Sequence, residues 1–188
     1  MKGLRIGRRH ARTNELPSSP LELALIPALT DDRWHIPDRF NFARDVVEAL
    51  ASDPKRRALT FLGKDGVIEP RTFLQIAEGA ARWASVIREH GVQPDDRVIV
   101  LAGSGVDWLE LMLGVMKVGA VAVPCSPTLS AAALESRVSS TEASLLVAEH
   151  SCQATVDQMS FTPDVHYLDD GRRRRAADVP KAPTHDTS

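Results

Sequence analysis

Residues 95–124 constrain the fold of this chain more than any other stretch. They read DDRVIVLAGSGVDWLELMLGVMKVGAVAVP: an apolar run, a Gly-Ser-Gly turn, an apolar-rich segment and a second, β-branched run that ends at Pro124. Both runs are apolar at consecutive positions, as strands buried on both faces require. A connection of this length joins parallel strands, so the stretch predicts a right-handed strand–helix–strand unit.

The turn at residues 103–105 stands where a dinucleotide-binding fingerprint would begin, after a strand and before a helix. However, Trp108 occupies the position of the third glycine, and residues 121–123 are Val-Ala-Val where an acid should bind the ribose. Ala102 and Val106 likewise replace the glycines of a nucleophile elbow. We therefore interpret the segment as a tight turn with Ser104 near the helix N-cap. A Rossmann-type oxidoreductase is the least favoured functional hypothesis.

Further elements precede this unit. Residues 58–62 and 67–69 enclose a Gly-Lys-Asp-Gly loop, which predicts a β-hairpin. Thr72 and Gln75 predict a capping box for the next helix, and Gly91 marks its C-terminal end. The spacing of its apolar stripe predicts a helix packed on the core, with Trp83 inside that core. The stripe consists of Phe73, Ile76, Ala77, Ala80, Trp83, Ala84 and Ile87.

Asn41 is expected to cap an earlier helix, and after residue 124 the pattern continues as helix, strand, short helix and strand. The apolar face of the early helix is expected to contain Phe42, Val46, Val47 and Leu50. The later elements are expected at residues 131–139 with Ser130 as N-cap, at 144–148, after His150, and at 165–168. The sequence thus predicts the α/β class: an open, mainly parallel sheet flanked by helices, with a small β-hairpin near the start.

The positive charges are concentrated near the two ends of the chain. Residues 1–14 contain five basic residues and no acidic one, and residues 172–175 are four arginines. Without these nine of the 23 basic residues, 14 remain against 25 acidic ones, so the body is acidic. Such a body argues against nucleic acid as a partner, because phosphate contacts need clustered Lys and Arg. No apolar run is long enough to span a bilayer.

Cys125 and Cys152 lie far apart, so neither a disulfide framework nor a zinc site is predicted. Two free thiols favour a reducing compartment, which we take to be the cytoplasm. Residues 1–14 lack the serines of a transit peptide and the apolar core of a signal peptide. We therefore divide the chain into a poorly ordered arm (1–39), an α/β subdomain (40–168) and a linker (169–188).

Two groups of residues resemble adenylate-forming acyl-CoA synthetases, the AMP-dependent synthetase and ligase family. Elements of the type (G)DRV.V and W....LG..K.GAV, followed by a strand that ends in proline, occur in this order in the N-terminal subdomain of that family. Here they are Asp96-Arg97-Val98, Trp108, Leu113-Gly114, Lys117, Gly119-Ala120-Val121 and Pro124. A similar entry, IP..FN.A.D at residues 36–45, is found in medium-chain and aromatic-acid members. The resemblance covers residues 34–168.

The resemblance implies a ligase that activates a carboxylic acid with ATP and Mg²⁺ as an acyl-adenylate, then transfers it to coenzyme A or another thiol, as in fatty acid metabolism. The family's phosphate loop, TSG(T/S)TG.PK, and its catalytic lysine do not occur in this chain. The loop would be expected close to Ser188. We therefore expect an N-terminal part that is inactive alone, with no catalytic residue, no metal ligand and no cofactor bound by itself.

The resemblance also implies one weak contact and one class of partner. Thr128 matches a glutamine that approaches coenzyme A in medium-chain members, which makes it a candidate cofactor-binding residue. The expected partner is the remainder of the ligase or, in its absence, a second copy of the chain. The alternative hypothesis is a free-standing α/β module that binds or regulates without catalysis.

Overall fold

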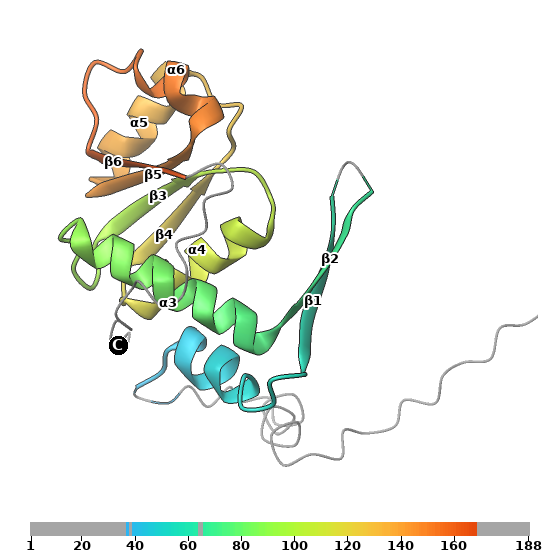
Figure 1. Cartoon of the computed structure of the whole chain (residues 1–188). Coiled ribbons are helices and arrows are strands. Elements are labelled where there is room, and N and C mark those ends of the chain that lie inside the picture. Colours follow the sequence, from blue (N-terminus) through green and yellow to red (C-terminus); the bar gives the residue numbers. More distant parts are fainter. Residues whose placement is uncertain (1–36, 38, 64–65, 169–188) are drawn as a thin grey trace, which may run out of the picture. The chain divides into compact units, whose positions relative to one another are not determined.

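The computed structural model describes residues 37, 39–63 and 66–168, all but the first of which lie in the unit Asp38–Ser188 (Figure 1). The proposed linker and nearly all of the proposed arm lie outside the described residues, so these boundaries stay predictions. The elements, in chain order, are η1 (Ala43–Glu48), β1 (Arg57–Leu62), β2 (Ile68–Thr72), α3 (Phe73–Glu89), β3 (Arg97–Leu101), α4 (Val106–Lys117), β4 (Val121–Cys125), α5 (Ala131–Thr141), β5 (Leu145–Glu149), η2 (His150–Cys152), α6 (Gln153–Val156) and β6 (Asp164–Leu168).

A four-stranded parallel sheet forms the centre of the domain, with the strand order β4-β3-β5-β6 (Figure 1). The predicted strand–helix–strand unit is β3-α4-β4, and its parallel strand pairing is confirmed. β3 lies between β4 and β5, and residues 98–101 are at most 1% exposed. This burial explains why the strand is apolar at consecutive positions.

Helices cover both faces of the sheet, which confirms the predicted α/β class. Val98 and Val100 face α3 and α4, while Ile99 and Leu101 face α5 and α6, because successive side chains of a strand point to opposite faces. The α3/α4 side includes Ala84, Ile87, Leu111, Val115, Leu145 and Val147, and the α5/α6 side includes Leu134, Val138, Leu146, Ala148 and Val156. Among the described residues, no helix is both long enough and apolar enough to cross a bilayer.

Helix α3 begins and ends as its sequence predicts. The Thr72 hydroxyl accepts from the Gln75 N–H at 3.3 Å, and the Gln75 side chain accepts from the Thr72 N–H at 3.0 Å. Gly91 has a φ of +76°, the left-handed conformation expected just after a helix. The expectation for Trp83 requires a correction, because its indole is only partly buried. It contacts His166 of the edge strand β6, so it covers the rim of the sheet rather than its centre.

The face predicted for the first helix is partly wrong. Ala43, Val47 and Leu50 are buried, whereas Phe42 is 46% exposed. Phe42 precedes the π-helical residues 43–48, at the N-terminal end of the helix, so it lies outside the segment that packs on the body. The N-cap prediction is confirmed, since Asn41 Oδ1 accepts from the Ala43 N–H at 3.1 Å.

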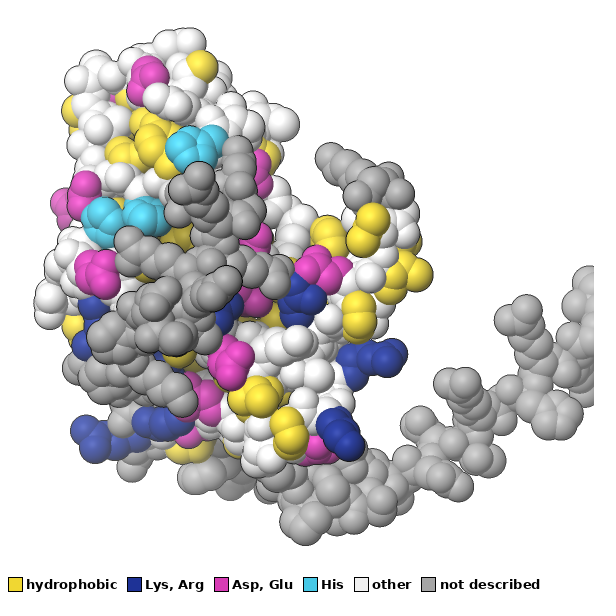
Figure 2. All heavy atoms as spheres, in the orientation of Figure 1, with side chains coloured by type: hydrophobic (Ala, Val, Ile, Leu, Met, Phe, Trp, Pro, Cys, Tyr) yellow, Lys and Arg dark blue, Asp and Glu magenta, His cyan; other side chains and the backbone are white. Residues whose placement is uncertain are grey.

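The antiparallel hairpin β1–β2 has one face against the body and one face toward solvent. Leu59 and Phe61 pack against a cluster formed by Val47, Ile76, Ala80, Val106 and Leu113. The opposite face contains Thr60, Leu62, Ile68 and Pro70, all exposed and none charged. Leu62 and Ile68, which are cross-strand partners, are 66% and 65% exposed. The hairpin thus presents an apolar outer face, and hydrophobic side chains gather along it in the space-filling view (Figure 2).

Candidate functional site

The carboxyl ends of β3, β4 and β5 meet at one edge of the parallel sheet, which we call the carboxyl edge. The chain leaves β3 for β4 on one side and then crosses to β5 on the other. Open α/β sheets bind their ligands at such a switch point, outside the carboxyl ends of the strands. Three loops form this edge: residues 102–105, 126–130 and 150–152.

Glu149 joins two of these loops. Its Oε1 accepts from the Gly103 N–H at 2.7 Å, and its Oε2 accepts from the Ser151 hydroxyl at 3.1 Å. The carboxylate therefore lies between the ends of β3 and β5 and gives the carboxyl edge a negative charge. Sequence reasoning did not identify Glu149 or Ser151 as site residues. The available signal was an acid that directly follows a run of four apolar residues, in a strand parallel to β3.

Thr128, the candidate from the sequence, lies in the third loop of the carboxyl edge. It is exposed, its Oγ1 is 2.8 Å from the Ser126 Oγ, and its N–H donates to that same oxygen at 3.3 Å. The Cys152 thiol donates to the Pro127 carbonyl at 3.8 Å, which places the loop beside residues 150–152. The fold thus brings Thr128 to the same edge as Glu149, and local hydrogen bonds hold its hydroxyl.

The two thiols are not activated. Burial raises the pKa of Cys125, and burial also raises the pKa of Cys152. A raised pKa keeps a thiol protonated, and the protonated form is a poor nucleophile and a poor metal ligand. Across the described part of the chain, no three His, Cys, Asp or Glu side chains are grouped so as to hold a metal ion together.

The glycine-rich turn is structural, as predicted, but its cap differs. Gly105 is the N-cap of α4, with an extended backbone and no side-chain hydrogen bond to the helix. Ser104 is exposed and does not cap the helix. The turn contributes the Gly103 N–H from which Glu149 accepts a hydrogen bond, and this bond joins the turn to the end of β5.

Residues of the DRV and LG..K.GAV elements have structural roles. The Arg97 guanidinium donates to the carbonyls of Thr141 and Glu142, at 2.5 Å and 2.8 Å, and so fixes the end of α5. Gly119 has a φ of +80°, which favours glycine in the turn between α4 and β4. These contacts stabilise the sheet and its helices, away from the carboxyl edge.

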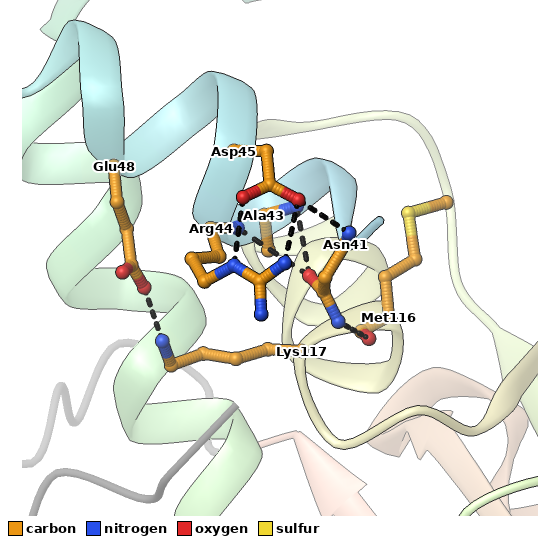
Figure 3. Close-up of polar contacts among 7 residues, drawn as sticks. All are labelled: Asn41, Ala43, Arg44, Asp45, Glu48, Met116 and Lys117. Carbon is orange, nitrogen blue, oxygen red and sulfur yellow. Dashed lines mark hydrogen bonds and ion pairs between the residues drawn. The ribbon is translucent and has the colours of Figure 1, made fainter. Parts of the chain in front are cut away.

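Lys117 is buried, which raises the question of a catalytic role. Its side chain is 7% exposed, and its ammonium pairs with the Glu48 carboxylate of η1 (Figure 3). A lysine that acts as base or nucleophile must reach a substrate, whereas this one is held in the contact between α4 and η1. Lys117 is therefore a structural residue.

Asn41 and Asp45 form a second polar connection beside this ion pair (Figure 3). The Asn41 Nδ2 donates to the Met116 carbonyl at 2.9 Å, and the Asn41 N–H donates to Asp45 Oδ2 at 2.7 Å. Arg44 donates to both Asp45 oxygens and thereby lowers the pKa of that carboxyl. Asn41 is 2% exposed, so it is a buried link between η1 and the end of α4.

Replacing Asn41 by alanine is expected to lower the free energy of unfolding by about 2 kcal/mol. The helix would lose its cap, and the Met116 carbonyl would lose a buried donor. Urea unfolding followed by circular dichroism measures this change. Asn41→Asp is the matched variant: it retains the cap but cannot donate to Met116. Equal stability of Asn41→Ala and the unmodified chain would contradict the assignment.

Comparisons with known proteins identify relatives of this α/β domain. A family model of AMP-binding enzymes matches residues 46–187. The mitochondrial acyl-coenzyme A synthetase ACSM5 of Mus musculus is 26% identical over 151 residues, which are 77% of this chain and 26% of that protein. Surfactin synthase subunit 2 of Bacillus subtilis is 30% identical over 125 residues, 66% of this chain and 3% of that protein.

The fold has been seen before in solved structures. An acyl-CoA synthetase from Brucella canis superposes with a TM-score of 0.73 at 17% identity, covering 80% of this chain and 30% of that one. At this level of identity the likeness concerns the fold alone. The chain spans about a quarter of the length of the curated acyl-CoA synthetases that it matches. The family model covers most of the sequence, including every residue of the DRV and LG..K.GAV elements, and the chain therefore belongs to the AMP-binding enzyme family.

Proposed function

We propose that this chain is the N-terminal α/β part of an acid–thiol ligase. The parent reaction joins a carboxylic acid and ATP to an acyl-adenylate, then transfers the acyl group to coenzyme A or another thiol. A carboxylate is a poor electrophile until AMP becomes its leaving group, which is why activation comes first. The observation that carries this proposal is the family match over residues 46–187, which includes a sheet built as in acyl-CoA synthetases.

The catalytic machinery of such a ligase requires phosphate-binding amides, a lysine and Mg²⁺ at the reacting phosphate. The described residues contain no three-ligand metal group, and their buried lysine pairs with Glu48. ATP and Mg²⁺ would therefore be bound mainly by parts of a ligase other than residues 39–168. This domain would pack against those parts of the ligase, and its carboxyl edge would form one side of the binding site.

Thr128 would be the point where this domain approaches coenzyme A. It is exposed at the carboxyl edge, and the adjacent Ser126 hydroxyl holds its side chain. A threonine hydroxyl can donate to the ligand as a glutamine amide does, although it reaches less far. The nearby Glu149 carboxylate disfavours the phosphates of coenzyme A, so the pantetheine arm is the part that fits this edge.

The chain by itself is expected to catalyse no acyl-adenylate formation. The reason is that it lacks the phosphate loop and the catalytic lysine of the family. The measurement is ATP–pyrophosphate exchange with a panel of fatty and aromatic acids, using an active benzoate CoA ligase as positive control. Acid-dependent exchange above the no-enzyme background would contradict the expectation.

The expected partner is the remainder of the ligase, and exposed apolar side chains on the hairpin β1–β2 support this expectation. Leu62, Val67 and Ile68 are each at least 60% exposed on the hairpin β1–β2. A two-stranded hairpin is marginally stable without a third layer, and contiguous apolar patches on a monomer usually mark an interface. Pro70 removes one backbone donor from β2, so a partner would cover the outer face rather than add a strand there.

Without that partner the isolated chain is expected to associate and to bind a hydrophobic dye. Light scattering over a concentration series measures the association. Leu62→Ser combined with Ile68→Ser should reduce both signals, because it removes the apolar pair from the outer face. Thr60→Ser, on the same face, is the control and should change neither.

A monodisperse monomer with a sharp cooperative melt and no dye binding would favour the alternative function, a free-standing α/β module. The cytoplasmic location remains a prediction from the free thiols. The name of the mouse relative places that protein in mitochondria. Fractionation of cells that express the chain separates the two locations.

A further inference from the structure

Two histidines that are far apart in the sequence meet at the other end of the sheet from the carboxyl edge. His90 is the C-cap of α3, and His166 belongs to the edge strand β6. The His90 Nε2 is 3.1 Å from the His166 Nδ1. Asp164, at the start of β6, has its Oδ2 2.5 Å from the His90 Nδ1. The three side chains thus form a row: carboxylate, imidazole, imidazole.

Asp164 determines which nitrogen of His90 faces its neighbour. The carboxylate can only accept a hydrogen bond, so it pairs with the Nδ1–H of His90, and the Nε2 is the nitrogen that faces His166. Histidines that bind metal ions use this same arrangement, in which a carboxylate holds one ring nitrogen and orients the other for coordination. The pair is also confined, because Trp83 packs edge-on against His166 with ring centroids 5.8 Å apart.

The separation of the two nitrogens suits a metal ion in place of the shared proton. With metal–nitrogen bonds of about 2.05 Å, nitrogens at the observed 3.1 Å subtend an angle of about 100° at the ion. This value lies between the angles of square-planar and tetrahedral coordination, so it suits Zn²⁺, Ni²⁺ or Cu²⁺. Imidazole nitrogens are preferred ligands of all three ions.

We propose that His90 and His166 form a binding site for a divalent transition-metal ion, with Asp164 as the positioning residue of His90. The ion bonds to the His90 Nε2 and the His166 Nδ1. The proton that lay between these nitrogens is replaced by one on the His166 Nε2, through exchange with solvent, so each ring keeps one N–H. No third His, Cys, Asp or Glu of the described residues completes a three-ligand group there, so water fills the remaining positions. The bound ion links the end of α3 to the edge of the sheet. This site is independent of the proposed ligase function.

The test is a titration of the full chain with ZnCl₂, followed by calorimetry and by thermal unfolding. The reference protein carries His10→Ala, His35→Ala and His185→Ala, which removes the histidines outside the described residues. In that background we expect saturable binding of one ion and a rise in the unfolding temperature. His90→Gln and His166→Gln should each abolish both effects, and Asp164→Asn should weaken the affinity by about 10-fold.

His150→Ala is the matched control and should bind as the reference does, since His150 stacks on Tyr167 away from the pair. Glutamine retains polarity at the two positions, and circular dichroism verifies that each variant is folded. NMR with Ni²⁺ gives a second readout, in which the imidazole signals of His90 and His166 broaden first. Equal Zn²⁺ binding by the reference and both glutamine variants, or no saturable binding, would overturn the proposal and leave a hydrogen-bonded pair.

Discussion

Replacing Gly114 by alanine is expected to lower the free energy of unfolding by about 3 kcal/mol, near the upper end of the usual cost of overpacking. A Cβ at this position of α4 would lie 2.5 Å from the Trp83 Cβ and 3.1 Å from two backbone atoms of α3, the Ala80 oxygen and the Ala84 nitrogen. Backbone atoms cannot move away by a change of rotamer, as a side chain can, so the two helices would have to separate. The gain of about 1 kcal/mol from the better helix propensity of alanine offsets part of the strain but does not exceed it.

Chemical denaturation of the two proteins measures this effect. Gly103→Ala is the matched control, because a Cβ there meets its nearest atom, the Glu149 Oε1, at 3.4 Å, an ordinary contact. It should change stability by less than about 0.5 kcal/mol, as substitutions without such clashes do. A Gly114→Ala protein as stable as the control would show that α3 and α4 are not this close.

Replacing Trp83 by alanine is expected to cost about 3 kcal/mol, the lower end of the range for a large aromatic residue. The indole packs against the cluster that joins α3, α4 and the sheet, but it is only partly buried. It also makes an edge-to-face contact with His166, with an angle of 88° between the rings. The loss therefore combines burial with one aromatic contact.

Trp83→Phe is the matched variant and should cost clearly less, because it retains a ring over the same cluster. A loss below about 1 kcal/mol for Trp83→Ala would mean that the indole does not pack as described. The double variant with Gly114→Ala gives a further check. Since alanine retains the Cβ that Gly114 approaches, Trp83→Ala should not relieve the clash, and the double variant should be less stable than either single variant.

The features that the sequence predicted correctly are those with local causes. Thr72 and Gln75 cap α3 through atoms three residues apart, and the left-handed turn at Gly91 depends on the absence of its own side chain. The apolar run of β3 predicted a strand buried on both faces, because each of its residues faces a helical layer. The residues that form such a cap, turn or apolar run lie within a few positions of one another, so the sequence alone is enough to recognise them.

The features that the sequence did not predict depend on residues brought together by the fold. Asn41 was identified as a cap, but its bond to the Met116 carbonyl joins positions 75 apart. Phe42 is exposed because it precedes the packed residues 43–48, which are wound as a π-helix that the apolar spacing did not predict. The link from Glu149 to the Gly103 N–H exists because β3 and β5 are neighbours in the sheet.

The sequence by itself therefore determined the α/β class, the caps of α3 and α5, and the membership in a ligase family through the residues of α4 and its flanking strands. Tertiary structure alone decided which side chains meet, such as Lys117 with Glu48 and His90 with His166, and that Thr128 lies at the same sheet edge as Glu149. The physical reason is that the hydrogen bonds of helices and their caps join neighbours in the chain. Contacts between elements depend instead on strand order and helix crossing, which the packing of the whole core selects.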